Sequence, residues 1–460
     1  MNAAATRPED PDRLWSVDEH LSDVLSTVRP LEPIELQLPD AQGCVLVEDV
    51  MVPVSLPPFD NSSMDGYAVR VADVAGASEE FPAALTVVGD VAAGAGDPPH
   101  VGPGQAARIM TGAPLPPGAE TVVPVEWTDG GLGGGPVSRM TAHSAAPEGA
   151  SGQVLVHRPA EARAHVRAKG SDTTAGERAL EAGTILGPSQ IALLAAVGHA
   201  SVRVRPRPRV VVISTGSELV QPGGELRPGQ IYDSNSFALT AAARDAGAIA
   251  YRVGAVTDDA DILRATIEDQ LVRADLVVTT GGVSVGAYDV VKEALSSVCG
   301  AEVAGDPEAD EGTEHTEHRE ETPAGPGVDF RRLAMQPGKP QGFGVVGPDH
   351  IPLLALPGNP VSSYVSFELF VRPAIRALMG LEDVHRPTLR AVLTAEKALT
   401  SPAGRRQFLR GRYAEGEVAP VGGASSHLVA ALAHADALIV VPEDVESVEP
   451  GTEVEVVLLG

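Results

Sequence analysis

The spacing of apolar side chains divides the sequence into stretches of different character. Residues 1–28 contain one segment whose apolar positions recur at helical spacing, which predicts an amphipathic helix that needs a partner surface. From about residue 30 to 205, short alternating runs are broken by proline and glycine, and this pattern predicts an all-β region. Inside it, residues 129–152 are rich in glycine, alanine and serine without periodicity, so a surface loop is expected.

The pattern changes after residue 205. Up to about residue 380, apolar strands alternate with longer segments of helical spacing, which predicts βαβ units and a mostly parallel sheet. Residues 303–327 interrupt this region with an acidic, proline-bearing segment that has almost no large apolar side chains, and a disordered insertion is predicted there. Beyond residue 381, short apolar runs predict a final small β unit.

Composition limits the possible functions. A chain of 460 residues is too long for one hydrophobic core, so several domains are expected. No apolar run is long enough to span a membrane, and the N-terminus carries acids and prolines where a secretory signal would be basic and apolar. Cys44 and Cys299 are the only cysteines, which fits a reducing cytoplasm and supports neither a disulfide framework nor a zinc site. The formal charge of −28 argues against nucleic-acid or anionic-membrane binding, so an anionic ligand requires a locally positive pocket.

Glycine and small hydroxyl residues follow two predicted strands of the α/β region. One strand runs directly into Gly281 and Gly282, and another ends before Thr215, Gly216 and Ser217. Strand ends of this kind bind anions in open α/β sheets, because glycine lets backbone N–H groups approach a phosphate closely. Each segment alone is more often an ordinary loop, whereas two at one sheet edge favour a pocket.

Three acids, Glu218, Asp258 and Asp289, each follow a predicted strand of the same sheet. Carboxylates grouped at one sheet edge favour a hard cation, and Mg²⁺ is typically bound through one or two carboxylates, several waters and a ligand's phosphates. The competing interpretation of Asp258 and its neighbour Asp259 is a helix N-cap. A magnesium ion would reconcile an anionic ligand with an acidic pocket.

Two further turns contribute candidate groups. The segment PGKP places Lys339, one of only four lysines, on a turn that flanking prolines make rigid. The segment LPGNP, residues 356–360, precedes a predicted helix whose positive N-terminus would face an anion. An ordinary turn with Asn359 as the helix cap explains the same residues equally well.

In the β-rich half, polar residues gather in three loops. Residues 57–69 hold Asp65 between predicted strands, Thr111 lies at a strand end, and a later loop holds Arg167 and Asp172. Each loop alone is typical of turn chemistry.

Taken in order, these motifs resemble those of one family. The similar segments are PPFDNSSMDGYAV, RIMTGAPLP, RAKGSD, STGSEL, GQIYDSN, TTGGVSVGAYD, PGKP and LPGNPVSS. They resemble the MoeA family, whose eukaryotic relative is the gephyrin E-domain. The resemblance covers roughly residues 12 to 460, with the two low-complexity segments as insertions.

The fold class that the resemblance implies is multidomain, α/β plus all-β. The implied domains are an N-terminal helix in residues 1–28 that packs on the α/β domain, a linking β-rich domain of residues 29–52 and 177–207, a β-rich domain of residues 53–176 with the MDGYA motif, a MogA-like α/β substrate-binding domain of residues 208–380 with a mostly parallel sheet, and a C-terminal small β-barrel-like domain of residues 381–460. A cytoplasmic homodimer is also implied, with contact to other molybdenum cofactor biosynthesis proteins.

The implied activity is that of a molybdopterin molybdenumtransferase. Such a molybdenum insertase transfers molybdate to the dithiolene of adenylylated molybdopterin with release of AMP, in a Mg²⁺-dependent reaction. The implied catalytic residues are Asp65, Thr111, Glu218, Asp289 and Lys339. The implied substrate-binding residues are Arg167, Asp172, Ser214, Gly281, Gly282, Ser284, Pro357, Asn359 and Pro360. The implied metal ligands are Asp258 and Asp289.

The chain departs from the family's pattern at Gln336, where the family usually has the first lysine of KPGKP. One positive charge is therefore missing from an anion site, and hydrogen bonds to charged groups contribute about 1.5 to 3 kcal/mol. This departure leaves open a catalytically weakened pterin-binding or scaffolding paralogue. A third possibility, an adenylyltransferase that resembles the α/β domain alone, is disfavoured by the long β-rich flanks.

Overall fold

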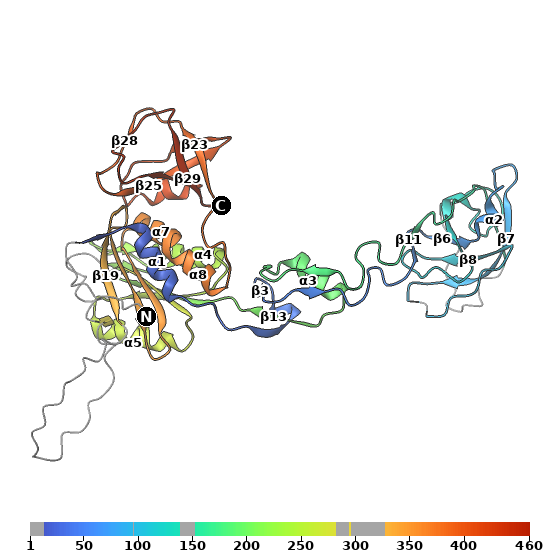
Figure 1. The fold of residues 1–460 in the computed structure, drawn as a ribbon, viewed down its shortest axis with the longest axis horizontal. Coiled ribbons are helices and arrows are strands. Elements are labelled where there is room, and N and C mark those ends of the chain that lie inside the picture. Colours follow the sequence, from blue (N-terminus) through green and yellow to red (C-terminus); the bar gives the residue numbers. More distant parts are fainter. Residues whose placement is uncertain (1–12, 95, 139–151, 282–293, 296–326) are drawn as a thin grey trace, which may run out of the picture. The chain divides into compact units, whose positions relative to one another are not determined.

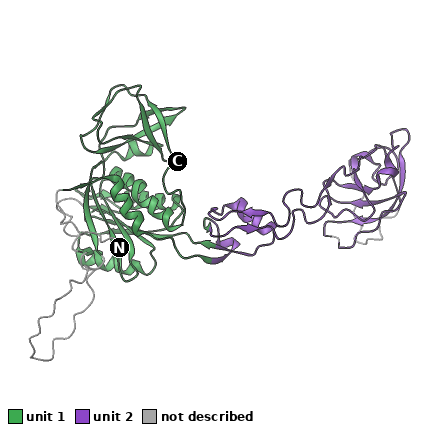
Figure 2. Cartoon of the chain, in the orientation of Figure 1, with its two compact units in different colours: residues 1–34, 43–45, 204–460 green, residues 35–42, 46–203 purple. Residues whose placement is uncertain are grey.

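The computed structural model of the chain describes residues 13–94, 96–138, 152–281, 294–295 and 327–460. The chain forms two compact units (Figure 2). Unit 1 consists of residues 1–34, 43–45 and 204–460, and unit 2 consists of residues 35–42 and 46–203. Residues 303–326 of the predicted insertion lie outside the described residues. Residues 139–151 of the predicted surface loop also lie outside them.

A seven-stranded sheet forms the centre of unit 1, in the order β1-β19-β21-β22-β18-β14-β17 (Figure 1). The strands are β1 (Leu14–Trp15), β14 (Arg209–Thr215), β17 (Ile249–Val256), β18 (Leu276–Thr280), β19 (Val328–Leu333), β21 (Pro340–Val346) and β22 (Ile351–Leu356). Strands β22, β18, β14 and β17 are parallel, whereas β21 is antiparallel to both of its neighbours. The four parallel strands therefore end at the same edge.

Helices cover both faces of this sheet, and the central strands β14, β18 and β22 are accordingly buried at nearly every position. The helices are α1 (Val17–Thr27), α4 (Asn235–Asp245), α5 (Ala260–Leu271), α7 (Pro360–Ser366) and α8 (Arg372–Leu378), and the π-helical turn η4 (Phe367–Val371) joins the last two. Val210 and Val212 of β14 pack with α1, α4 and α7–α8, whereas Val211 and Ile213 pack with α5. The small strands β15 (Leu219–Val220) and β16 (Ile231–Tyr232) pair with each other in a separate two-stranded sheet.

The C-terminal part of unit 1 is a closed barrel of five strands, because β25 pairs with β27 as well as β26. Its elements are β23 (Thr388–Leu393), β24 (Leu399–Thr400), β25 (Arg406–Ala414), β26 (Glu417–Pro420), α9 (Val429–Ala433), β27 (Ala437–Val441), β28 (Ser447–Val448) and β29 (Glu453–Leu458). Strand β20 (Met335–Gln336) leaves the α/β part and pairs with β25. Phe408, Leu438 and Val440 of the barrel join the hydrophobic core of the α/β part, so the two parts pack directly together.

Unit 2 is built mainly from strands. Its largest sheet has the order β10-β7-β8-β6-β9 and contains β6 (Gly66–Val69), β7 (Ala83–Val91), β8 (Gln105–Ile109), β9 (Thr121–Pro124) and β10 (Gln153–Val156). Its short elements are β2 (Ile34–Gln37), η1 (Leu38–Asp40), β3 (Val45–Leu46), β4 (Val50–Met51), β5 (Asn61–Ser62), α2 (Val71–Val74), η2 (Val125–Trp127), β11 (Val166–Arg167), β12 (Arg178–Leu180) and β13 (Ser201–Arg205). Core residues pack on both faces of the largest sheet, which makes this part a self-contained β structure.

The prediction that residues 30 to 205 are all-β is wrong in two segments, the single helical turn α2 (Val71–Val74) and a longer helix. Residues Pro188–Ala196 form the helix α3. Pro188 stands in its first turn, where its missing N–H costs nothing, and Gln190 accepts a hydrogen bond from the backbone of Gly187 at 3.1 Å. The alanine- and leucine-rich segment that follows has high helix propensity, and this local preference outweighs the β character of its surroundings.

His20 of α1 is fully buried against the sheet and should make the stability of unit 1 depend on pH. Its ring lies edge-on to Phe370 with centroids 4.7 Å apart. Burial, followed by the charge of Arg331, lowers the pKa of His20 to about 4, and Asp23 opposes this shift. The folded-state pKa lies below the unfolded value of about 6.5, so the stabilisation is complete above pH 6.5 and is lost as the pH falls toward 4.

The expected loss of folding free energy between pH 7 and pH 5 is about 2 kcal/mol from this one group. His20→Phe keeps an apolar ring at the site but cannot titrate. Thermal unfolding followed at pH 7, 6 and 5 should show a smaller decrease for the variant than for the wild type. Parallel pH profiles would contradict the assignment.

Candidate functional site

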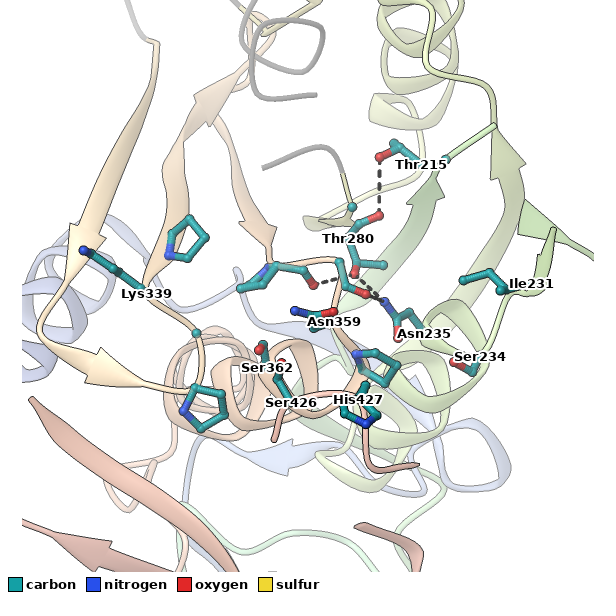
Figure 3. Close-up of a pocket in the computed structure, with 18 of the residues that line it drawn as sticks. Thr215, Ile231, Ser234, Asn235, Thr280, Lys339, Asn359, Ser362, Ser426 and His427 are labelled. Carbon is teal, nitrogen blue, oxygen red and sulfur yellow. Dashed lines mark hydrogen bonds between the residues drawn. The ribbon is translucent and has the colours of Figure 1, made fainter. Parts of the chain in front are cut away.

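A cavity of about 910 Å³ lies in unit 1, where β14, β18 and β22 end (Figure 3). The loops that follow these strands line it together with the turn before β21 and a loop of the C-terminal barrel. The residues that line it include Thr215, Glu218, Ile231, Asp233, Asn235, Asp258, Thr280, Gly281, Gln336, Lys339, Pro357, Gly358, Asn359, Pro360, Ser362, Arg405, Ser425, Ser426 and His427. The volume lies within the range of about 300 to 1,000 Å³ that is usual for ligand pockets.

Hydrogen bonds tie the strand ends together at the base of the cavity. The Asn235 side chain donates to Thr280 Oγ1 at 3.0 Å and to the carbonyl of Gly358 at 2.7 Å. Thr280 Oγ1 in turn donates to the carbonyl of Pro357 at 3.1 Å, and these bonds are drawn in Figure 3. Residues from three separate elements thus share one network, which fixes the shape of the pocket before any ligand binds.

Gly281 occupies the position next to β14 that no other residue type fits. Its φ is +101°, and a Cβ atom would lie 2.2 Å from the carbonyl oxygen of Thr215. The backbones of two parallel strand ends approach this closely only because the side chain is a hydrogen.

Two of the predicted acids, Glu218 and Asp258, line the cavity. The Asp258 carboxylate accepts a hydrogen bond from the backbone N–H of Ser217 at 3.1 Å, which holds it against the loop after β14. The helix-cap role belongs to Asp259, whose side chain accepts from Ile262 N at 3.0 Å. Neither Glu218 nor Asp258 forms an ion pair with another described residue, so both carboxylates are open to a cation.

Ser214 is a predicted ligand contact that the structure places behind the wall. Its side chain is fully buried and donates to Asp233 Oδ1 at 2.9 Å. The same Asp233 oxygen accepts from Ser236 N at 3.1 Å at the start of α4. Ser214 therefore positions Asp233, which itself lines the cavity.

Among the described residues, the lysine and arginine of the wall are Lys339 and Arg405. Lys339 follows Gly338, whose φ is +103°, and the Lys339 carbonyl accepts from Leu333 N at 2.7 Å. Figure 3 places the Lys339 side chain on the opposite side of the pocket from Ile231 and Asn235. Gln336 also lines the cavity. The pocket therefore has an uncharged residue at the position where the family usually has the first lysine of KPGKP.

Matches to known proteins decide the family. The sequence model described as "MoeA N-terminal region (domain I and II)" matches residues 15–198, "Probable molybdopterin binding domain" matches residues 211–377, and "MoeA C-terminal region (domain IV)" matches residues 392–459. Molybdopterin molybdenumtransferase 2 of Mycobacterium tuberculosis is 45% identical over 444 residues, which cover 96% of this chain and 98% of that protein. The chain belongs to the MoeA family.

Other MoeA-family members support the same assignment. Molybdopterin molybdenumtransferase of Bacillus subtilis is 33% identical over 96% of this chain and 94% of that protein. The crystal structure of a molybdopterin biosynthesis MoeA protein from Pyrococcus horikoshii matches with a TM-score of 0.69 at 32% identity, covering 97% of this chain and 100% of that chain. The predicted family and the predicted fold class are both confirmed.

The C-terminal barrel supplies pocket residues that the sequence did not reveal. Arg405, Ser425, Ser426 and His427 line the cavity (Figure 3 labels the last two). The carbonyl of Ser426 accepts from Val361 N at 3.0 Å, so the barrel loop already occupies the first N–H group of α7. The N-terminus of α7 was expected to be open to an anion. This expectation is wrong for the N–H of Val361, which is already bonded within the protein. In the sequence, only the serine pair followed by a histidine in a polar loop could have pointed to Ser425, Ser426 and His427 as site residues.

The predicted site residues of unit 2 belong to the loops around β5 and β11. Asp65 Oδ1 accepts from Thr111 N at 2.6 Å and from Thr111 Oγ1 at 2.8 Å, so these two predicted residues meet. Arg167 pairs with Asn61 across the β11–β5 ladder, and Asp172 N donates to the carbonyl of Leu56 at 3.0 Å. Both side chains are exposed.

The same loops also contain Asp60, which the sequence analysis did not select. Its carboxylate accepts from Arg163 at 2.9 Å and from Lys169 N at 2.7 Å, and these bonds, that of Arg163 first, lower the pKa of Asp60. Asp60 thereby connects the MDGYA loop to the loop that carries Arg167 and Asp172.

Three predicted site residues, Gly282, Ser284 and Asp289, lie outside the described residues. Within the described ranges, no three His, Cys, Asp or Glu side chains are grouped so that they could hold a metal ion. In the same part of the chain, every helix is too short or too polar to cross a membrane.

Proposed function

We propose that this MoeA-family enzyme of molybdenum cofactor biosynthesis is a molybdenum insertase. It transfers molybdate to the dithiolene of adenylylated molybdopterin and releases AMP in a Mg²⁺-dependent reaction. The observation that carries the proposal is that Lys339 and Arg405 line one cavity together with Glu218, Asp233 and Asp258, and most of that cavity lies in the domain that matches the molybdopterin-binding model. The relatives named molybdopterin molybdenumtransferase support the reaction type.

Lys339 and Arg405 provide the anion-binding part of the pocket. The chain carries a formal charge of −28, so a polyanionic ligand is repelled by most of its surface. Local positive charge inside a partly enclosed cavity overcomes this repulsion, because charges interact more strongly there than in bulk water. The hydroxyl groups of Ser362 and Ser426 add neutral donors to the same wall. Lys339 and Arg405 would neutralise the charge that develops on the phosphate of AMP as the diphosphate link breaks.

Glu218 and Asp258 fit the requirements of a magnesium ion. Mg²⁺ keeps several waters and takes one or two carboxylates together with substrate phosphates, and these two residues line the pocket without an ion pair to any described residue. When bound, Mg²⁺ would polarise a phosphoryl oxygen and neutralise part of the diphosphate charge. Asp289 remains a proposed third ligand.

Asp65 and Thr111 are proposed to act in the same reaction from unit 2. Two hydrogen bonds from Thr111 hold the Asp65 carboxylate in one orientation, as a positioning or proton-accepting group requires. Arg167 and Asp172 are proposed to bind the substrate.

We further propose a cytoplasmic homodimer. Sedimentation analysis of the purified protein would test its dimeric state directly.

The test of the proposed function is release of AMP from adenylylated molybdopterin by the purified protein. AMP should form only when molybdate and Mg²⁺ are both present, and EDTA should stop its formation. Omission of molybdate alone separates insertion from simple hydrolysis of the diphosphate. If AMP fails to form with both supplied, the insertase proposal is wrong.

Gln336 supports a second candidate, a paralogue that binds the pterin without turnover, because it places a neutral amide in the pocket wall. If the chain is an insertase, Gln336→Lys should lower the KM for molybdate by about tenfold with little change in kcat, since a hydrogen bond to a charged group contributes about 1.5 to 3 kcal/mol. Steady-state AMP release at varied molybdate concentration measures this effect. Activity in Gln336→Lys with none in the wild type would favour the second candidate.

A further inference from the structure

Arg410 of β25 is a buried charge that the proposed chemistry does not use. Only 2% of its surface is exposed. Its Nη2 donates to the carbonyl of Gly423, while its Nε is buried and has no hydrogen-bond partner among the described residues. Burial lowers the pKa of this guanidinium, because desolvation disfavours the charged form.

Among the described residues of unit 1, Arg372 is the other buried arginine, and it has a carboxylate partner, as does the largely buried Arg331. Arg372 pairs with Asp245 at 3.0 Å, and Arg331 pairs with Asp23 at 2.5 Å. Within the described part of the chain, Arg410 forms no ion pair. A buried guanidinium without a counter-ion costs several kcal/mol unless an anion or strong hydrogen bonds compensate it. This unbalanced charge points to an anion outside the protein.

The segment that Arg410 supports leads directly to the pocket. Val421 N donates to the carbonyl of Arg410 at 2.8 Å, and the guanidinium holds Gly423 just beyond. The next residues, 424–427, line the cavity, and the carbonyl of Ser426 is bonded to Val361 N (Figure 3). The pocket wall from the barrel is therefore anchored at both ends, by Arg410 on one side and by the start of α7 on the other.

We propose that Arg410 is a positioning residue for ligand binding. It holds the segment 421–427 as one wall of the pocket, and its positive charge behind that wall favours the anion that the pocket binds. The identification of that anion as molybdate rests on the proposed function, whereas the positioning of the segment does not.

The experiment compares Arg410→Met, Arg410→Lys and the matched control Arg412→Met, because Arg412 lies two residues along the same strand and is exposed. Equilibrium binding of molybdate is measured by titration calorimetry, and hydrogen exchange is measured for peptides that cover 421–427. Arg410→Met should weaken molybdate binding about tenfold, which corresponds to 1.4 kcal/mol, and should speed exchange of these amides. Arg410→Lys keeps the charge but not the planar fork, so exchange should stay fast and only the part of the affinity that depends on charge should return.

Three results would overturn the proposal. They are wild-type affinity in Arg410→Met, equal loss of affinity in Arg410→Met and Arg412→Met, or a lower melting temperature of Arg410→Met with unchanged affinity and unchanged exchange. Both measurements are made without turnover. A wild-type protein that binds molybdate but releases no AMP would therefore refute the insertase function and leave the role of Arg410 to be decided by the same data.

Discussion

Lys339→Met is expected to reduce the rate of AMP release by about 10²- to 10³-fold, the usual effect of removing one preorganised group that stabilises charge in a transition state. Lys339 and Arg405 are the lysine and arginine that line the pocket among the described residues, and the Lys339 backbone is fixed by the hydrogen bond from Leu333 N. Methionine has a similar length without the charge, so the loss should reflect electrostatics more than packing. Single-turnover AMP release, with all substrates saturating, measures the effect on the chemical step.

Two further lysine variants make this test specific. Lys397 is exposed in a turn of the C-terminal barrel, and Lys397→Met removes the same charge from the chain without touching the pocket, so its rate should equal that of the wild type. Lys339→Arg keeps the charge on a bulkier group and should recover part of the activity. Activity of Lys339→Met within about fivefold of the wild type would exclude this side chain from the reacting centre, given the expected magnitude.

The part of the site formed by strand ends could be predicted because it depends on local sequence. Apolar runs followed by glycine or small polar residues mark the ends of β14, β18 and β22, and parallel strands bring those ends to one sheet edge. Glu218, Asp258 and Gly281 line the cavity for this reason. Ser214 shows the limit of such reasoning. Successive side chains of a strand point to opposite faces, and the sequence does not tell which of the two neighbours, Ser214 or Thr215, faces the pocket. In the structure Thr215 lines the pocket and Ser214 is buried behind it.

The contribution of the C-terminal barrel could not be predicted because it depends on contacts between distant segments. Arg405 reaches the cavity because β25, which begins at the next residue, pairs with β20, and this pairing joins residues about 70 positions apart. His427 reaches it because the adjacent Ser426 is bonded to Val361 at the start of α7. Neither contact leaves a periodic pattern in the sequence. The helix α3 was missed for a different reason: its helix propensity is local, but the short β runs on both sides led to an all-β prediction for the whole region.

Gly281→Ala is expected to be the most damaging small substitution in the pocket. The added methyl group would lie 2.2 Å from the carbonyl oxygen and 2.8 Å from the hydroxyl of Thr215, so the end of β14 or of β18 must move. The φ of +101° adds backbone strain for any residue with a side chain. Strain at such a position and overpacking each cost about 1 to 3 kcal/mol, so a loss of roughly 2 to 6 kcal/mol in folding free energy is expected.

Activity should fall together with stability, because the displaced residues are those that shape the base of the pocket. The hydrogen bonds of Thr280 with Asn235 and Pro357 lie next to Gly281, and a shift of β18 would disturb both. AMP release should therefore decrease at least tenfold even at temperatures where the variant stays folded, since misplacement of about 1 Å can cost 10²-fold in rate.

Gly451→Ala separates the two causes of this loss. Gly451 has a φ of +82°, but a Cβ atom there would meet no other heavy atom within 4 Å. Its replacement carries the backbone cost alone, about 1 to 2 kcal/mol, with no effect on the pocket. Thermal unfolding and AMP release measured on both variants should show a larger effect on each quantity for Gly281→Ala. Equal behaviour of the two variants would mean that the close approach of Gly281 to Thr215 is not needed to shape the pocket.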